Sequence, residues 1–350
     1  MNEDYWSMHL NLDKKQLLAA IKKESETLQK PVSFMEVCGG HTNTIMRYGI
    51  RSILPDNISL LSGPGCPVCV TAQEDIDAVI ELAMKGIPVA TYGDMLRVPG
   101  TKMSLEKARA KGASVHMVYS SAEVLKLKEK FPDIVFFGIG FETTTPMSAF
   151  LLEHNVPVYS THKLIAPGMN ALLDENIAID GFILPGHVSV ITGLEEFKKI
   201  KVPQAVCGFE PEHLLRGIYA LVRMINENKK NLVNTYPEAV RSRGNEKATA
   251  LIAKHFVLQD SVWRGIGVIP GSGFEVKSDS LNAKKIHANY LKDLKSQENN
   301  GCRCGEVLKG LIKPTECELF SKVCTPDSPQ GACMVSSEGA CQIYYNFREN

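Results

Sequence analysis

The sequence predicts an α/β protein with two similar parallel-sheet domains facing a central cleft, plus a small C-terminal iron–sulfur domain. Short apolar runs alternate with helical stretches through the first 240 residues. This alternation is typical of parallel sheets that are covered by helices on both faces. In addition, polar or Gly-rich motifs follow the apolar runs, and six of the ten cysteines fall in the last fifty residues.

The expected elements follow in chain order. Residues 10–30 have helical periodicity and i,i+4 charge pairs, which indicates an exposed helix. Strands are expected at residues 33–38, 58–62, 87–92 and 114–119 in the first half, and at 133–138, 156–160, 181–184 and 204–208 in the second. Helices are expected at residues 71–85, 104–111, 145–153, 169–176, 193–199 and 211–229.

Four strands in each half give domain boundaries at residues 1–121 and 122–240. The polar stretch 231–246 is expected to be a linker or an excursion from the second domain. Residues 241–350 have few long apolar runs after Cys302 and would form a loop-rich third domain organised by cysteines.

Composition limits the classes of function. The net charge is zero, so nothing indicates a nucleic-acid partner. The first residues are acidic and polar, unlike a signal peptide, and no apolar stretch approaches the roughly 20 residues that span a membrane. These features predict a cytoplasmic protein. Cytoplasmic thiols are mostly kept reduced, so clustered cysteines indicate metal binding or redox activity before structural disulfides.

The C-terminal cysteines have the spacing C-x-C-x12-C-x6-C-x8-C-x7-C. The spacing lacks the C-x2-C pairs of a zinc ribbon and the close run of a ferredoxin. Four thiolates would hold a [4Fe–4S] cluster, and the two remaining cysteines would form a dithiol that exchanges electrons with it. Spacing alone does not say which four bind, and structural zinc or plain disulfides are the alternative interpretation.

Cys38 and His41 are separated by two residues and stand directly after an expected strand. The two intervening glycines allow a turn that brings both side chains to one point. A thiolate and an imidazole would provide two ligands for iron or zinc. The alternative is a buried strand-end cysteine and a histidine that serves only the loop.

Cys66 and Cys69 lie in the motif GPGCPVC, before a helix expected to start near Thr71. A C-x2-C pair at a helix N-terminus has lowered thiol pKa values and is typical of a redox-active dithiol. The alternative is a zinc site that these two cysteines share with Cys38 and His41, and hence a zinc-dependent enzyme with a structural C-terminal domain.

Two further residues follow expected strands, where ligands gather in parallel sheets. Glu142 lies in GFETTTP, and His187 lies in PGH. Either residue could have a functional role in the cleft between the two sheets. The simpler interpretations are that Glu142 caps the following helix and that His187 hydrogen-bonds within its loop.

Taken together, the motifs resemble the HypD family of hydrogenase maturation proteins, which helps to assemble the Fe(CN)2CO centre of [NiFe]-hydrogenases. The resemblance runs from about Met35 to Tyr345. It rests on MEVCGGHT (35–42), GPGCPVCV (63–70), YGDMLRVPG (92–100), FFGIGFETT (136–144), PGHVS (185–189), GFEP (208–211), WRGIGVI (263–269), CGEVL (304–308) and MVSSEGAC (334–341). Each motif is weak alone, and all of them in this order are specific.

The resemblance implies two α/β domains, a [4Fe–4S] domain, a small HypC-like partner that carries the iron, and a HypE-like donor of cyanide. Cys38 would help to hold the iron beside His41, and Cys66 and Cys69 would be the redox pair. The resemblance also implies Cys304, Cys317, Cys324 and Cys341 as cluster ligands, with Cys302 and Cys333 as a redox disulfide. The expected role is an assembly platform with redox activity and no conventional turnover.

Overall fold

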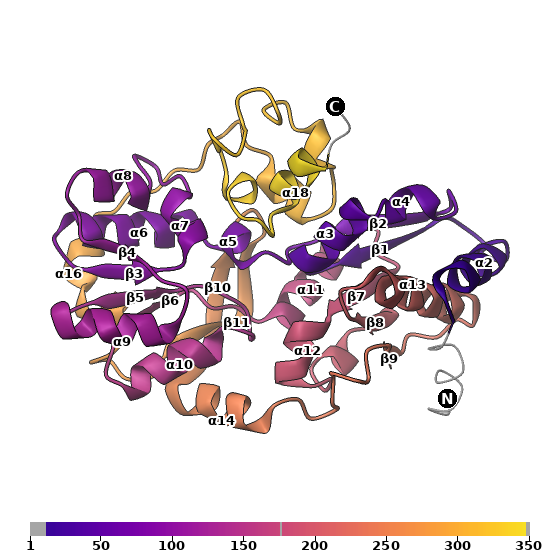
Figure 1. Ribbon diagram of the computed structural model, residues 1–350, viewed down its shortest axis with the longest axis horizontal. Helices are drawn as coiled ribbons and strands as arrows, with labels where there is room; N and C mark the ends of the chain where they lie inside the picture. The colour runs from indigo at the N-terminus through magenta and orange to yellow at the C-terminus, as the bar shows by residue number, and fades with distance from the viewer. Residues whose placement is uncertain (1–11, 176, 348–350) are drawn as a thin grey trace.

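The computed structural model describes residues 12–175 and 177–347. The expected start of the first helix at residue 10 and the expected end of another at residue 176 lie outside these ranges. Two parallel sheets and one antiparallel hairpin form the frame (Figure 1). The strands are β1 (Val32–Glu36), β2 (Ile58–Ser62), β3 (Val89–Thr91), β4 (Val115–Met117), β5 (Val135–Gly138), β6 (Val158–Ser160), β7 (Gly181–Pro185), β8 (Gln204–Cys207), β9 (Leu232–Asn234), β10 (Phe256–Trp263) and β11 (Gly267–Val276).

The helices of the first 240 residues cover both sheets. They are α2 (Lys14–Ser25), α3 (Gly39–Arg47), α4 (Ile50–Ile53), α5 (Pro67–Val70), α6 (Gln73–Met84), α7 (Gly93–Arg97), α8 (Leu105–Ala110), α9 (Ser121–Lys130), α10 (Thr145–Glu153), α11 (Ile165–Asp174), α12 (Gly186–Thr192), η1 (Phe197–Lys199) and α13 (Pro211–Asn226). The remaining helices are α14 (Glu246–His255), α15 (Ala283–Ile286), α16 (Ala288–Leu291), α17 (Cys304–Leu308), η2 (Pro314–Glu316), η3 (Ala332–Met334) and α18 (Ala340–Asn346). None of the helices in the described ranges is long and apolar enough to cross a bilayer.

The two parallel sheets confirm the predicted fold class, and all eight expected strands are present. The expected domain boundary at residue 121 is wrong. One sheet has the order β2-β1-β7-β8-β9, and the other has the order β4-β3-β5-β6. The second sheet is therefore built from a segment inserted between the two halves of the first. Both sheets use the same pattern of apolar runs, so the pattern does not say which strand joins which sheet.

Each sheet is packed on both faces. In the first sheet, α13 packs on β7 and β8 and against α2, whose start is fixed by a capping box between Asp13 and Gln16. In the second sheet, α6 and α8 cover one face, and α9 and α10 cover the other (Figure 1). The buried apolar residues of one face, among them Phe136 and Ala149, form a core with α14 and the hairpin.

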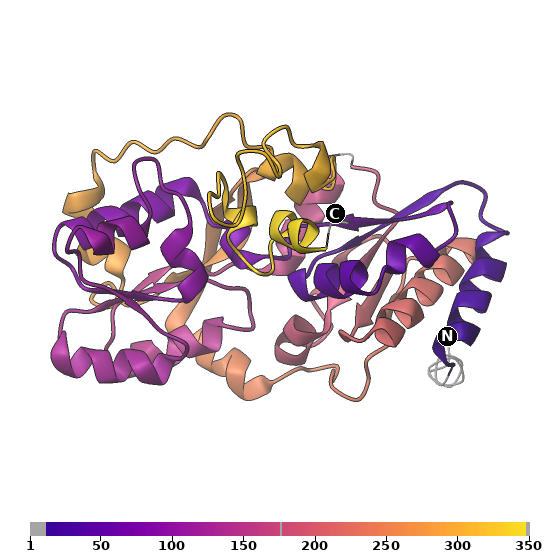
Figure 2. The ribbon, with the colours of Figure 1, turned by 45° about the horizontal axis from the view of Figure 1, so that its top comes forward.

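Residues 241–350 are not one separate domain. The segment from α14 through the β10–β11 hairpin packs on the second sheet, where Ser160 Oγ donates to the carbonyl of Phe274 at 2.6 Å. The hairpin was not expected from the sequence, and β9 occupies part of the expected linker. After α16 the chain crosses back over the molecule to the cysteine-rich segment, residues 302–347, which lies above α5 and α3 (Figure 2).

Candidate functional site

Cys38 lies between the end of β1 and the first turn of α3, in a very close-packed place. A Cβ added to Gly39 would lie 2.4 Å from the carbonyl oxygen and Cβ of Glu338, and one added to Gly65 would lie 2.1 Å from the nitrogen of Cys38. The two glycines are therefore required by close approach of three chain segments. They bring the β1–α3 turn, the GPG loop and the cysteine-rich segment together around Cys38.

The thiol of Cys38 is half-buried, and its pKa is raised to about 12 by desolvation, with added repulsion from Glu338 and Glu36. The Glu36 carboxylate accepts hydrogen bonds from the Cys38 backbone N–H at 3.1 Å and from the Thr42 hydroxyl. Burial raises the pKa of Glu36 to about 7. Cys38 is consequently a protonated thiol at neutral pH, and a metal that binds it must displace the proton. The sequence analysis missed Glu36, although it precedes the motif by two residues.

His41 is fully buried on α3, and desolvation lowers its pKa to about 4, so the ring is neutral. Its Nε2 lies 3.1 Å from the carbonyl oxygen of Gly208, which assigns the proton to Nε2 and leaves the lone pair on Nδ1. Nδ1 has no hydrogen-bond partner among the described residues. His41 stacks on Phe209, with ring centroids 4.9 Å apart, and Phe209 also lies 4.0 Å from the ring of His187. Phe209 thereby joins two predicted site residues.

Cys66 and Cys69 form a disulfide across the four-residue helix α5. Both residues are buried, and the Cys69 N–H donates to Cys66 Sγ at 3.2 Å. The long helix expected after the motif begins only at Gln73, so the pair caps α5 rather than that helix. The dipole argument for lowered thiol pKa values therefore does not apply as predicted. A C-x2-C pair within bonding distance remains the arrangement of a redox couple.

All six C-terminal cysteines line one small cavity; they are Cys302, Cys304, Cys317, Cys324, Cys333 and Cys341. The Sγ atoms of Cys304 and Cys333 lie 2.7 Å apart. Cys302, Cys304 and Cys333 are all free thiols in this structure, so the pairing of Cys302 with Cys333 and the place of Cys304 among the cluster ligands stay predictions. Spacing could not identify the pair, because Cys302 and Cys304 are two residues apart and only the direction of each side chain distinguishes them.

The Cys304 thiol is surrounded by hydrogen-bonding groups. Contacts with Cys302 and Cys333, together with the nearby positive charge of Arg264, lower its pKa, while the pKa of Cys333 is raised by the same contact. Of the pair, Cys304 is thus the residue that ionises first. All six cysteines that line the cavity supply sulfur donors, which is the donor type that an iron–sulfur cluster uses.

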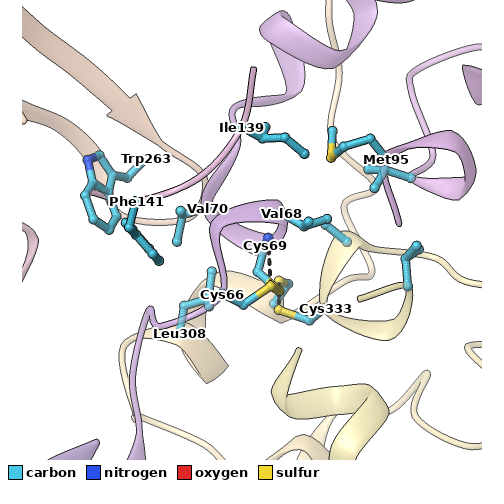
Figure 3. Packing of buried hydrophobic residues seen from close by; sticks show 14 of the residues in the cluster. Cys66, Val68, Cys69, Val70, Met95, Ile139, Phe141, Trp263, Leu308 and Cys333 are labelled. Atoms are coloured by element: carbon cyan, nitrogen blue, oxygen red, sulfur yellow. Dashed lines mark hydrogen bonds between the residues drawn. A yellow bond between two sulfur atoms is a disulfide. The ribbon is translucent and has the colours of Figure 1, made fainter. Parts of the chain in front are cut away.

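The Cys304/Cys333 pair and the disulfide belong to one apolar core. The short helix η3, which carries Cys333, packs against α5, and Figure 3 shows the Cys333 side chain pointing toward the Cys66–Cys69 disulfide. Leu308 and Val68 belong to the same buried cluster (Figure 3). Within residues 12–175 and 177–347, no three Cys, His, Asp or Glu side chains converge where a single ion could bind. The geometry thus places the Cys304/Cys333 thiols and the Cys66–Cys69 disulfide in one buried core.

A known protein family matches nearly the whole chain. A family model described as HypD, hydrogenase formation hypA family, matches residues 13–348. The chain belongs to the HypD family. It is 41% identical over 355 residues to the hydrogenase maturation factor HypD of Azotobacter vinelandii, covering 95% of this chain and 93% of that protein. It is 38% identical over 354 residues to the HypD of Cupriavidus necator, with the same coverage of 95% and 93%.

An archaeal relative extends the similarity. The chain is 40% identical over 347 residues to a putative hydrogenase expression/formation protein of Methanocaldococcus jannaschii, covering 95% of this chain and 97% of that protein. The resemblance to the HypD family stated from the motifs is thereby confirmed over nearly the whole chain.

Glu142, the remaining predicted site residue of this HypD family member, lies away from these contacts. Its Oε1 accepts from the Ile165 N–H at 3.1 Å, at the start of α11, and its buried Oε2 has no hydrogen-bond partner in the part of the chain that the structure describes. Burial raises its pKa to about 7. Glu142 therefore ties the β5–α10 loop to α11. It does not cap α10, so the simpler interpretation of its position in the sequence is wrong.

Proposed function

We propose that this chain is a redox-active scaffold for assembly of the Fe(CN)2CO centre of [NiFe]-hydrogenases. The observation that supports this best is that a thiol pair, Cys304/Cys333, and a disulfide, Cys66–Cys69, share one buried core next to the Cys38 turn, where η3 packs against α5. The relatives named above are hydrogenase maturation factors or hydrogenase formation proteins, and this supports a hydrogenase as the protein for which the centre is assembled. A HypC-like chaperone and a HypE-like cyanide donor are the proposed partners.

In this proposal the iron is cargo, and Cys38 holds it. The raised pKa of the Cys38 thiol means that iron binding releases a proton, and Glu36, which accepts from the Cys38 N–H, is the nearest buried carboxylate. His41 is neutral and has a free lone pair on Nδ1, so it is competent as a second ligand or as a hydrogen-bond acceptor. The site is partly open at Cys38, which allows a partner to deliver the cargo.

A [4Fe–4S] cluster fits the donor set of Cys302, Cys317, Cys324 and Cys341, and when bound it supplies electrons one at a time. The chain's own thiols carry the two-electron chemistry. Cys333 passes its proton to the neighbouring Cys304 thiolate as its sulfur attacks one sulfur of the Cys66–Cys69 disulfide, and the other sulfur leaves as a thiolate that takes up this proton. The Cys304 thiolate then attacks Cys333 Sγ and releases the second thiolate. Two electrons reach Cys66 and Cys69, which take up two protons, and Cys304 and Cys333 end as a disulfide.

The zinc-enzyme alternative has no comparable support. Cys66 and Cys69 are joined to each other, so they are not available as zinc ligands in this state.

The first experiment measures iron, sulfide and zinc in anaerobically purified protein, with visible and EPR spectra before and after dithionite. About four irons and four sulfides with a reducible signal are expected. The redox role is then tested with Cys304→Ser, which should leave Cys66–Cys69 oxidised after dithionite, as read by thiol trapping and mass spectrometry. Cys207→Ser is the control, because Cys207 is a buried core cysteine bonded only to Thr235 and its own strand. Zinc without sulfide, or full reduction of Cys66–Cys69 in Cys304→Ser, would contradict the proposal.

A further inference from the structure

A second cavity lies beside the cysteine-rich segment and is used by none of the steps above. It has a volume of about 340 Å³ and opens between the loop at 99–101, the segment 297–304 and the turn 329–331. Its lining is mostly uncharged and polar, and includes the side chains of Gln73, Thr101, Gln297, Asn299 and Gln330. Gln73 Nε2 and Thr101 Oγ1 donate to the buried Asp77 carboxylate, and Asn299 Nδ2 donates to Gln330 Oε1, so a ligand's oxygen atoms can use only the donors that remain on these amides.

Arg264 supplies the positive charge of this cavity. It is 6% exposed, its backbone N–H donates to Val70, and its Nε donates to the carbonyl of Thr71 at 2.9 Å. Its Nη2 is buried and has no hydrogen-bond partner among the described residues. An unpaired buried guanidinium donor is costly, because it has lost its hydration without gaining an acceptor.

No carboxylate in the described chain pairs with Arg264. The ion pairs of the described residues do not include it, and the acidic residue in the cavity lining, Glu298, has an exposed side chain. Exposed charges are screened by water and salt, whereas a buried guanidinium is not. The cavity therefore presents a net attraction for an anion at its inner wall.

The same cavity reaches two thiols. Cys302 and Cys304 both line it, and the backbones of Gly265 and Gly305 touch, since a Cβ on Gly265 would lie 2.2 Å from the Cα of Gly305. This contact places Arg264 and Cys304 side by side at the inner end of the cavity. A molecule bound to Arg264 would therefore lie in the same cavity as these two thiols.

We propose that this cavity is a binding site for a small organic carboxylate, held by Arg264 and the surrounding amides. A planar carboxylate matches the fork of a guanidinium, and its oxygens accept from the neighbouring amide donors. The volume is at the lower end of the range for ligand sites, which limits the ligand to a small metabolite. This inference goes beyond the proposed assembly function and does not depend on it.

The test compares two alkylating reagents, iodoacetate and iodoacetamide, on the reduced full-length protein. In both cases the thiolate sulfur forms a bond to carbon, the carbon–iodine bond breaks and iodide leaves, so the reagents differ mainly in the carboxylate. Peptide mass spectrometry gives the two rates at Cys302 and Cys304. Their ratio in the native protein is divided by the ratio in urea-unfolded protein. We expect iodoacetate to be favoured by about tenfold in the native state.

Three variants make the test specific. Arg264→Gln should bring the normalised ratio close to one. Arg264→Lys keeps the positive charge and should retain most of the preference for iodoacetate. It serves as the second variant if loss of the Thr71 contact prevents Arg264→Gln from folding. Arg303→Gln is the matched control: it removes an equal charge next to Cys302 and Cys304, but its guanidinium is engaged with Glu306. If Arg264 only stabilised the Cys304 thiolate, Arg264→Gln would slow both reagents equally and leave the ratio unchanged.

An unchanged ratio in Arg264→Gln, a native ratio equal to the unfolded one, or no alkylation of either thiol would each overturn the carboxylate site. Measuring alkylation at both Cys302 and Cys304 keeps this test independent of the proposed function. If one of the two cysteines binds a cluster, it is protected from both reagents, and the other cysteine still gives the ratio of the two rates. The metal and sulfide content tests the cluster independently.

Discussion

Gly39→Ala is the sharpest test of how the cysteine-rich segment docks on the Cys38 turn. The added Cβ would stand 2.4 Å from the backbone oxygen and from the Cβ of Glu338. Nonbonded heavy atoms normally pack at about 3.5 Å or more, so the two segments must separate by about 1.1 Å (3.5 − 2.4). Because one of the obstructing atoms belongs to the backbone, a rotamer change cannot relieve the clash.

The expected loss of stability follows from two opposing contributions. Overpacking of this kind costs about 1–3 kcal/mol, and alanine in place of glycine in a helix returns up to about 1 kcal/mol. The net cost of up to about 2 kcal/mol would lower Tm by a few degrees and would be concentrated between α3 and residues 331–341. Since Cys333 and Cys341 lie in that stretch, the variant should also lose bound iron and sulfide more readily.

Denaturant unfolding and iron retention on dilution measure these two effects. Gly301→Ala is the control, because a Cβ there would meet side-chain atoms only at 3.4 Å or beyond, which is ordinary contact. A Gly39→Ala protein with wild-type stability and wild-type iron retention would refute the inferred close approach.

Three other changes test separate parts of the site. Cys38→Ala should abolish binding of the iron cargo while leaving fold and cluster intact; infrared bands of cyanide and CO on the purified complex are the measurement, and retained bands would exclude Cys38. Cys324→Ala should remove the visible absorbance of the cluster, and an unchanged spectrum would exclude Cys324 as a ligand. Glu142 has a folded-state pKa of about 7 against an ordinary 4.5, so the folded state binds the extra proton between these values and stability should fall as pH rises from about 4.5 to 7. Glu142→Gln should flatten that decline, worth up to about 3 kcal/mol, and an equally steep pH profile would show that Glu142 is not its source.

The elements were predictable from the sequence, but their assembly into sheets was not. Apolar runs such as residues 58–62 and 181–184 match β2 and β7 closely, because a buried parallel strand needs a continuous apolar run. The pattern holds no information on strand order, which is why the boundary at residue 121 was wrong. The β10–β11 hairpin was missed because its outer positions include exposed apolar residues such as Leu258 and Val268, which obscure the expected alternation.

The candidate site was predictable where a motif fixes spacing, and not where side-chain direction decides. The Cys66–Cys69 pair follows from C-x2-C, which allows few geometries. The choice between Cys302 and Cys304 as the partner of Cys333 depends on how α17 meets η3, which no local pattern encodes. Arg264 stands in a motif that the sequence analysis used only for the resemblance, and its unpaired Nη2 emerges only once the surrounding burial is known.

The insertion of one sheet within the other has a consequence for synthesis on the ribosome. β1 cannot acquire its partner β7 until residues 181–185 have emerged, whereas β3 to β6 lie within residues 89–160 and can pair first. The Cys38 turn is thus among the earliest parts of the chain to be made and among the last to be enclosed, since it also awaits Glu338 near the C-terminus. A nascent or truncated chain would expose Cys38 without its surroundings, so Cys38 is enclosed only once the segment around Glu338 has been made and has docked.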